Sequence, residues 1–117
     1  MEIQFIYAAM RVRDVTDAAK FYAKVLGREP DDRPMDTLVQ WRYTNAGIQL
    51  FADAENAGHG TMTLVVPDMD AVNTQLAAQG IDTGPIQRGD FGRIARFNDA
   101  DGNDIVLAEP PPRVSTG

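Results

Sequence analysis

The sequence contains no cysteine, which excludes disulfide bonds and thiolate chemistry. Its one serine, Ser115, lies near the end of the chain, so we expect no serine nucleophile. Its one histidine, His59, cannot form a histidine-rich metal site. No apolar run approaches the length of a membrane-spanning helix, and the first residues lack the pattern of a signal peptide. We therefore expect a cytoplasmic protein that has no membrane partner.

Basic residues are also scarce: 11 Lys and Arg stand against 17 Asp and Glu, which gives a net charge of -6. Nucleic acid phosphates require a basic surface, so the balance argues against nucleic acid as a partner. It is compatible with a cationic ligand, although solubility alone also explains it. The sequence contains no glycine-rich phosphate-binding motif either, so nothing supports a nucleotide cofactor.

What the sequence does contain is one pattern twice. Residues 8–27 and 62–80 each read as an apolar strand, an aspartate, an amphipathic helix and a glycine. Asp14 and Asp68 are the first choices for helix caps, because a short side-chain oxygen can accept the free N–H groups of the first turn. Aligning these two aspartates places apolar residues on apolar residues, namely Val12 on Val66, Val15 on Met69, Ala18 on Val72, Tyr22 on Leu76, Ile48 on Ile105 and Leu50 on Leu107.

The repeat predicts two βαβββ modules, over residues 1–53 and 61–109, within a single domain of residues 1–110. The proline-rich tail at 111–117 cannot continue a sheet. We expect helices at about 16–26 and up to about 79, a linker at 54–60, and weaker strands or loops at 29–36 and 81–88. The clearer strands are expected at 3–12, 37–44, 47–53, 61–66, 92–97 and 103–109.

A cluster of aromatic residues on the predicted strands indicates a small-molecule site. If Asn45-Ala46-Gly47 forms a three-residue hairpin turn, Tyr43 pairs with Gln49 and Trp41 pairs with Phe51. Cross-strand partners share a face of the sheet, so these four would lie together, joined by Tyr7 of the first strand. Flat apolar rings with a few polar groups are typical of ligand pockets. The alternative is that Trp41 and Phe51 simply fill the core.

Two arginines on one predicted strand, Arg93 and Arg96, stand at unlike parity, so only one can face a cleft. Our choice is Arg96, which would favour an anionic group on the ligand. The run Asp99 to Asp104 faintly suggests a calcium loop, but its glycine and the residue at its twelfth position do not match an EF-hand. A turn between two strands is the better interpretation.

Two motifs resemble the vicinal oxygen chelate superfamily, which includes glyoxalases, extradiol dioxygenases and bleomycin-resistance proteins. The first motif is Val12-Arg13-Asp14 followed by Ala18, Phe21, Tyr22, Leu26 and Gly27, and the second runs from Asp99 to Leu107 as DADGNDIVL. The resemblance covers about residues 3–109. It implies an α+β fold in which two tandem βαβββ modules form one curved mixed sheet, with the helices on its outer face. Fold alone does not fix activity.

Many enzymes of that superfamily hold a divalent metal on the concave face, with ligands on the first and last strand of each module. The resemblance places those four positions at Tyr7, Gln49, Thr61 and Val106. Valine cannot bind a metal, and neutral hydroxyl groups bind one weakly. We therefore expect no metal, no other cofactor and no catalytic residue.

The sequence thus favours a small-molecule-binding protein that resembles bleomycin-resistance proteins and sequesters an aromatic or cationic ligand without a metal. The resemblance also implies a homodimer, in which modules can be exchanged. One alternative is a metal-dependent enzyme with a displaced site made by Gln49, His59 and Glu109. Another is a metal-free isomerase or lyase that uses Tyr7 as its acid–base group. The predicted ligand-binding residues are Tyr7, Trp41, Tyr43, Gln49, Phe51, Thr61, Arg96 and Val106.

Overall fold

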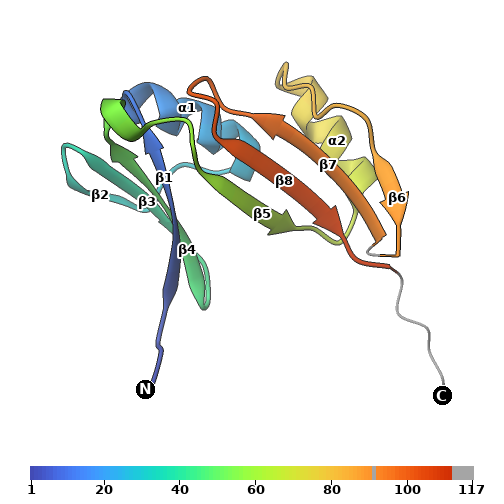
Figure 1. Cartoon of the computed structure of the whole chain (residues 1–117), viewed down its shortest axis with the longest axis horizontal. Helices are drawn as coiled ribbons and strands as arrows, with labels where there is room; N and C mark the ends of the chain where they lie inside the picture. Colours follow the sequence, from blue (N-terminus) through green and yellow to red (C-terminus); the bar gives the residue numbers. More distant parts are fainter. Residues whose placement is uncertain (91, 112–117) are drawn as a thin grey trace. The chain divides into compact units, whose positions relative to one another are not determined.

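The computed structural model describes residues 1–90 and 92–111, and its chain follows the predicted βαβββ plan twice (Figure 1). The α+β class and the two tandem modules are confirmed. Most of the predicted tail, residues 112–117, lies outside the described residues. In chain order the elements are β1 (Ile6–Val12), α1 (Val15–Leu26), β2 (Asp32–Met35), β3 (Leu38–Arg42), β4 (Ala46–Ala52), a short 3-10 helix η1 (Ala54–Asn56), β5 (Thr61–Val65), α2 (Met69–Ala78), β6 (Gln87–Gly89), β7 (Gly92–Asn98) and β8 (Asp104–Glu109).

Each module folds into a four-stranded mixed sheet. The strand order is β1-β4-β3-β2 in the first sheet and β5-β8-β7-β6 in the second, so both modules place their first strand beside their last. In the first sheet β1 runs parallel to β4, while β3 runs antiparallel to both β4 and β2. A parallel pair needs a long crossover connection, and α1 with β2 and β3 supplies it.

The core of the first module lies between α1 and one face of its sheet. Asp14 caps α1 by accepting the N–H groups of Thr16 at 2.9 Å and Asp17 at 3.1 Å, and Gly27 ends the helix in a left-handed conformation with φ 75°. Burying each large apolar side chain here contributes roughly 1.5–3 kcal/mol. The buried residues of this core are Met10, Val12, Val15, Tyr22, Val25, Val39, Trp41, Ile48 and Leu50.

The second module has the same plan. Asp68 caps α2 by accepting the N–H of Ala71 at 3.0 Å. Four of the six apolar pairs that the repeat aligns are buried in both modules, which supports the duplicated pattern; they are Val15 and Met69, Tyr22 and Leu76, Ile48 and Ile105, and Leu50 and Leu107. In the other two pairs Val12 is buried, whereas Val66, Ala18 and Val72 are half-buried.

The hairpin between β3 and β4 differs from the prediction. Trp41 pairs with Ile48 and Gln40 pairs with Gln49, so the turn consists of two residues, Thr44 and Asn45, instead of three. The shift in register is three positions, and any odd shift turns every side chain of a strand to the other face. The predicted pairs Tyr43 with Gln49 and Trp41 with Phe51 are therefore wrong.

The packing of Trp41 explains this register. Its ring is fully buried on the α1 side of the sheet, with its centroid 6.4 Å from that of Tyr22. Its indole Nε1 donates a hydrogen bond of 3.0 Å to the carbonyl of Arg28. A buried tryptophan needs both apolar neighbours and a partner for its N–H, and this face supplies both.

The chain forms two compact units whose boundary does not coincide with the module boundary. Met1–Thr61 and Asn98–Asp104 make up the first unit, so the turn between β7 and β8 packs with the first module. Buried Asn103 shows how: its Nδ2 donates to the Arg11 carbonyl at 2.8 Å, and its Oδ1 accepts the Gly60 N–H at 2.8 Å. The predicted turn is confirmed, and it also completes the first unit.

Candidate functional site

The side of the first sheet that faces away from α1 carries the strongest candidate for a binding surface. We call it the Gln49 face. Strand pairing places its side chains in three rows across the sheet, since directly paired residues share a face. The rows are Tyr7, Gly47 and Arg42; Ala9, Gln49, Gln40 and Asp32; and Arg11, Phe51, Leu38 and Met35.

The middle row is polar from β4 to β2. Gln49 Nε2 donates a hydrogen bond of 3.1 Å to Gln40 Oε1. Gln40 is only 9% exposed and Gln49 is half-buried. Next to Gln40, Asp32 accepts a hydrogen bond from the Arg42 guanidinium. This hydrogen bond and the charge of Asp32 raise the pKa of Arg42 above its ordinary value.

The first row depends on a glycine. A Cβ at Gly47 would stand 2.6 Å from Tyr7 Cε1 and 2.6 Å from the Trp41 carbonyl oxygen, closer than real contacts allow. The Tyr7 ring therefore lies directly against the backbone of Gly47. Phe5 packs beside it, with ring centroids 4.7 Å apart. This row presents aromatic surface at one end of the Gln49 face.

The structure thus brings three of the predicted ligand-binding residues, Tyr7, Gln49 and Phe51, onto one face. Trp41 is on the opposite face and fully buried, so it cannot touch a ligand bound here. Tyr43 follows the end of β3, where the Arg28 guanidinium stacks 4.5 Å from its ring centroid. Sequence reasoning missed Gln40, because the wrong hairpin register assigned it to the other face.

The remaining predicted residues belong to the second sheet. Arg93 of β7 reaches Asp70 of α2, so alternation along the strand places Arg96 on the face away from α2. Val106 is 6% exposed between two residues that also are buried, and Thr61 is exposed at the start of β5. Their predicted roles as ligand contacts stay predictions.

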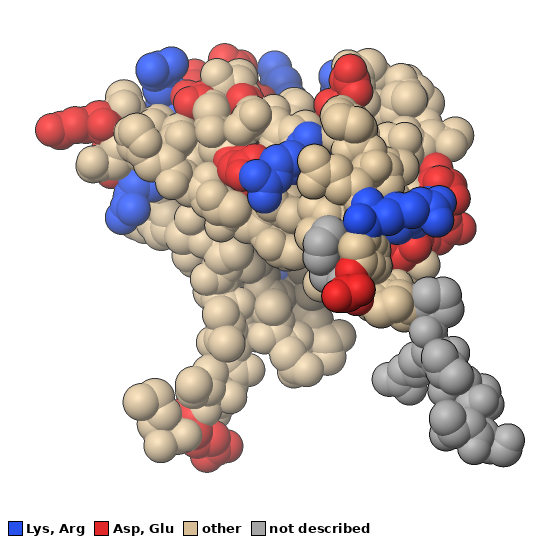
Figure 2. All heavy atoms as spheres, turned by 45° about the vertical axis from the view of Figure 1, so that its right-hand side comes forward, with Lys and Arg blue, Asp and Glu red and all other residues tan. Residues whose placement is uncertain are grey.

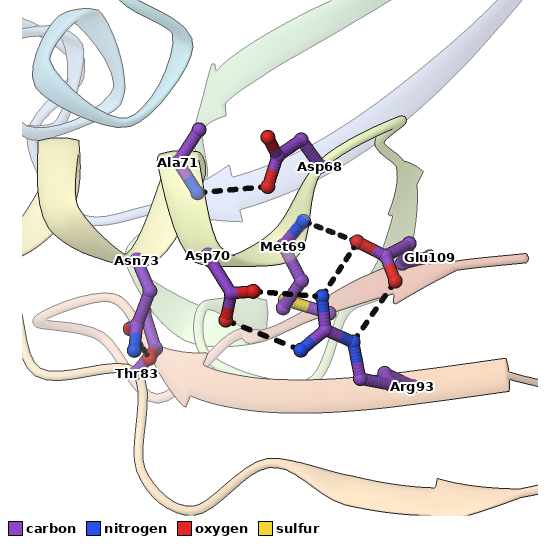
Figure 3. A network of polar contacts seen from close by, with 8 residues as sticks. All are labelled: Asp68, Met69, Asp70, Ala71, Asn73, Thr83, Arg93 and Glu109. Atoms are coloured by element: carbon purple, nitrogen blue, oxygen red, sulfur yellow. Dashed lines mark hydrogen bonds and ion pairs between the residues drawn. The ribbon is translucent and has the colours of Figure 1, made fainter.

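Arg93 has another role, which Figure 3 shows. Its guanidinium lies between Asp70 and Glu109, donating to Glu109 Oε1 and Oε2 at 2.9 Å each and to the Asp70 oxygens at 3.1 and 3.2 Å. Glu109 Oε2 also accepts the first N–H of α2, from Met69, at 2.5 Å. The hydrogen bonds from Arg93, and then that from Met69, hold the pKa of Glu109 at about 2. Both oxygens of Glu109 are therefore engaged in fastening α2 to the sheet.

The superfamily's metal does not fit the donors present. Of its four expected positions, Val106 has no donor atom, Tyr7 has its ring packed on Gly47, and Gln49 is hydrogen-bonded to Gln40. Within residues 1–90 and 92–111 no group of three or more His, Asp or Glu side chains could hold a metal ion. His59, one member of the alternative displaced site, is exposed.

A separate hollow of about 220 Å³ lies at the start of α1. Asp99 in its wall is buried and fully hydrogen-bonded: it accepts from Tyr22 Oη at 2.8 Å and from the backbone N–H of Asp101 and Asn103 at 3.0 and 2.9 Å. The walls consist of Arg13, Asp14, Asp17, Ala18, Phe21, Asp99, Ala100 and Asp101. The tight internal bonding of Asp99 shows a structural role for this turn.

Charged side chains of both signs are mixed on the surface that Figure 2 draws. On the face drawn in Figure 2, Lys and Arg side chains lie singly or beside acidic ones, without a continuous basic surface. In the described part of the chain, no helix is both long and apolar enough to cross a membrane.

Two βαβββ modules, each with one helix on a four-stranded mixed sheet, define the vicinal oxygen chelate fold. Residues 4–107 match the model of the Glyoxalase/Bleomycin resistance protein/Dioxygenase superfamily, and the chain belongs to that family. No curated protein matches the sequence.

Solved structures agree with this assignment. A glyoxalase / bleomycin resistance protein from Catenulispora acidiphila DSM 44928 is 29% identical, with a TM-score of 0.84 over 92% of this chain and 98% of that one. The lactoylglutathione lyase from Agrobacterium tumefaciens is 24% identical, with a TM-score of 0.73 over 90% and 92% of the two chains. TnmS3, an antibiotic binding protein from Streptomyces sp. CB03234, is 24% identical, with a TM-score of 0.77 over 95% and 97%.

Proposed function

We propose that this protein binds an aromatic or cationic small molecule on the Gln49 face and holds it without a metal and without reaction. The observation that carries the proposal is the composition of this face. It joins the Tyr7 ring, the half-buried Phe51 ring and the Gln40–Gln49 amide pair on one surface. Apolar rings with a few oriented polar groups are what a small-molecule site requires.

Membership of this family is compatible with both ligand binding and catalysis. Its solved structures include an antibiotic binding protein and a lactoylglutathione lyase, so the choice depends on the residues of this chain. A metal-dependent lyase needs several nitrogen or carboxylate donors around one ion. At the four family positions this chain offers none of these donors, since the strongest one there is the neutral Gln49 amide oxygen, and a net charge of -6 is compatible with a cationic ligand.

The second candidate is the metal-dependent enzyme with a displaced site made by Gln49, His59 and Glu109. Two observations weigh against it: both Glu109 oxygens are bonded to Arg93 and Met69, and His59 is exposed. Metal analysis of the purified protein tests it. A stoichiometric metal, or a rise in melting temperature on adding nickel, zinc or manganese, would favour the enzyme over the binding protein.

A thermal-shift screen with planar aromatic compounds, neutral and cationic, followed by calorimetric titration, tests the binding proposal. Phe51→Ala should weaken any compound found by about tenfold, because a buried aromatic contact contributes on the order of 1.5 kcal/mol. Trp41→Phe is the matched control, since Trp41 faces α1. It should lower stability and leave the affinity of the folded protein unchanged. The proposal is wrong if no aromatic compound binds.

We also propose that the protein is a homodimer, as the resemblance implied, and that it works in the cytoplasm. Light scattering on the purified protein tests the dimer, and a monomer at micromolar concentration would contradict it.

A further inference from the structure

The most specific feature of the Gln49 face is its pair of neighbouring amides. Gln40 and Gln49 are direct partners on β3 and β4, and one hydrogen bond of 3.1 Å joins Gln49 Nε2 to Gln40 Oε1. That bond uses one donor and one acceptor. The outer atoms that remain are Gln49 Oε1, an acceptor, and Gln40 Nε2, a donor.

Both outer atoms are open to a ligand. Across the described residues the one side-chain nitrogen or oxygen that is buried without a partner is Asp32 Oδ1. Gln49 Oε1 and Gln40 Nε2 have no hydrogen-bond partner among the described residues, and neither is among the fully buried side-chain atoms, so each keeps some exposed surface. The face therefore presents an acceptor and a donor side by side.

This arrangement does not depend on which way the two amides are turned. If both were flipped, Gln40 Nε2 would donate to Gln49 Oε1, and the outer atoms would be Gln49 Nε2 and Gln40 Oε1. One donor and one acceptor would again face outward. The pattern follows from the pairing of two glutamines.

The surroundings make these two atoms selective. Leu38 and Phe51 form the row on one side of the pair, and Tyr7 over Gly47 forms the row on the other. Leu38 is 7% exposed and Gln40 is 9% exposed, so the amides have apolar rows on two sides, while the ion pair of Asp32 and Arg42 lies beside Gln40. A hydrogen bond is stronger in such surroundings, and an amide left without a partner costs more.

We propose that the Gln40–Gln49 pair recognises an edge of the ligand in which an N–H donor stands next to a C=O acceptor, as in a lactam, an imide or a carboxamide on a planar ring. This inference rests on the proposed function and specifies its ligand. Gln40 donates to the ligand carbonyl while Gln49 accepts from the ligand N–H, and the ring lies on the apolar rows beside them. Val106 occupies the aligned position in the second module, so only the first module can make this contact.

Matched ring compounds provide the test: 2-quinolone, which has the N–H and C=O edge, N-methyl-2-quinolone, which lacks the N–H, and quinoline, which lacks both. We expect the protein to bind 2-quinolone about three- to tenfold more tightly than N-methyl-2-quinolone, the ratio that one hydrogen bond gives. Gln40→Leu with Gln49→Leu should abolish this preference. Gln75→Leu, the same change at an exposed position of α2, should leave it intact.

A second measurement uses only the wild-type protein, so it does not depend on whether a variant folds. In proton–nitrogen correlation spectra, the side-chain amide signals of Gln40 and Gln49 should shift with 2-quinolone and much less with the N-methyl compound. Equal affinity for the two compounds, or a preference that survives in the double variant, would overturn the inference while leaving the proposed function standing. If none of the three compounds binds, the inference is contradicted. If no planar compound of any kind binds, the proposed function fails with it.

Discussion

The polar contacts that hold the helix in place differ between the two modules. In the first, the buried Tyr22 hydroxyl of α1 donates to Asp99 at 2.8 Å, and Asp99 is 8% exposed. In the second, Arg93 links Asp70 of α2 to Glu109 at the end of β8, and the Asp70 side chain is 74% exposed. The first contact is a buried hydrogen bond to a carboxylate, whereas the second is an ion pair that water reaches.

The aligned positions explain this difference. Tyr22 corresponds to Leu76, so only the first helix has a hydroxyl that can reach a carboxylate from the core. Burial, and then the charge of Asp99, raise the pKa of Tyr22 above its ordinary 10.0, so the hydroxyl keeps its proton and remains a donor. Asp99 also comes from the second module's turn, which makes the first unit depend on chain far away in sequence.

Removing the carboxylate at the first contact should have the largest effect. Asp99→Ala removes the acceptor of the Tyr22 hydroxyl, of the backbone N–H groups of Asp101 and Asn103, and of one of the two N–H groups of the Asn103 side-chain amide. We expect the free energy of unfolding to fall by at least about 3 kcal/mol, since each buried unpaired donor costs about 1–3 kcal/mol. Urea denaturation measures the loss. Asp36→Ala, at an exposed turn of the same unit, should change it by less than about 0.5 kcal/mol. Equal losses in the two variants would contradict the role given to Asp99.

A second difference between the modules lies at Gly47 on the Gln49 face. Gly47 corresponds to Asp104, so the second module has a side chain where the first has none. Gly47→Ala should lower the free energy of unfolding by about 1–3 kcal/mol, because the new Cβ meets Tyr7 and the Trp41 carbonyl.

A double-mutant cycle with Tyr7→Ala identifies which neighbour is responsible. If the Tyr7 ring carries part of the clash, Gly47→Ala should cost less in the Tyr7→Ala background. The contact with the backbone carbonyl remains in both, so the relief should be partial. A fully additive cycle would show that the ring does not lie against Gly47.

The sequence predicted the helices, their caps and the buried stripe of each module, because these follow from local spacing. Asp14, Asp68 and the aligned apolar pairs illustrate this. It failed at Trp41 and Gln40, where the register of one hairpin decides which face each side chain takes. A shift of three positions moves every side chain of the strand to the opposite face, so it exchanges the core face and the Gln49 face.

Contacts between segments that are distant along the chain could not be predicted from the sequence either. The turn at 98–104 was correctly predicted from its aspartate and asparagine residues. Nothing in the local sequence indicates that Asp99 accepts a hydrogen bond from Tyr22, or that Asn103 donates one to the Arg11 carbonyl. Likewise Arg93 could be assigned a parity, but its position between Asp70 and Glu109 depends on how α2 lies on the sheet.

The smallest expected effect concerns the second module and depends on pH. The pKa of Glu109 falls from an ordinary 4.5 to about 2 on folding, chiefly through its hydrogen bonds with Arg93. A carboxylate whose pKa is lowered in the folded state stabilises the protein above its unfolded pKa, and this contribution is lost as the pH falls from 4.5 to about 2. Glu109→Gln should therefore melt at a lower temperature than the wild type at neutral pH, and the gap should close across that window.

Melting temperatures at a series of pH values measure this gap, and the difference between the two proteins cancels the other carboxylates that titrate in the same range. Glu29→Gln, a matched change at an exposed position, should follow the wild-type curve throughout. A gap that stays constant with pH would mean that Glu109 acts through packing alone. The charge of Glu109 would then contribute nothing to holding α2, and the contrast between the modules would be one of burial only.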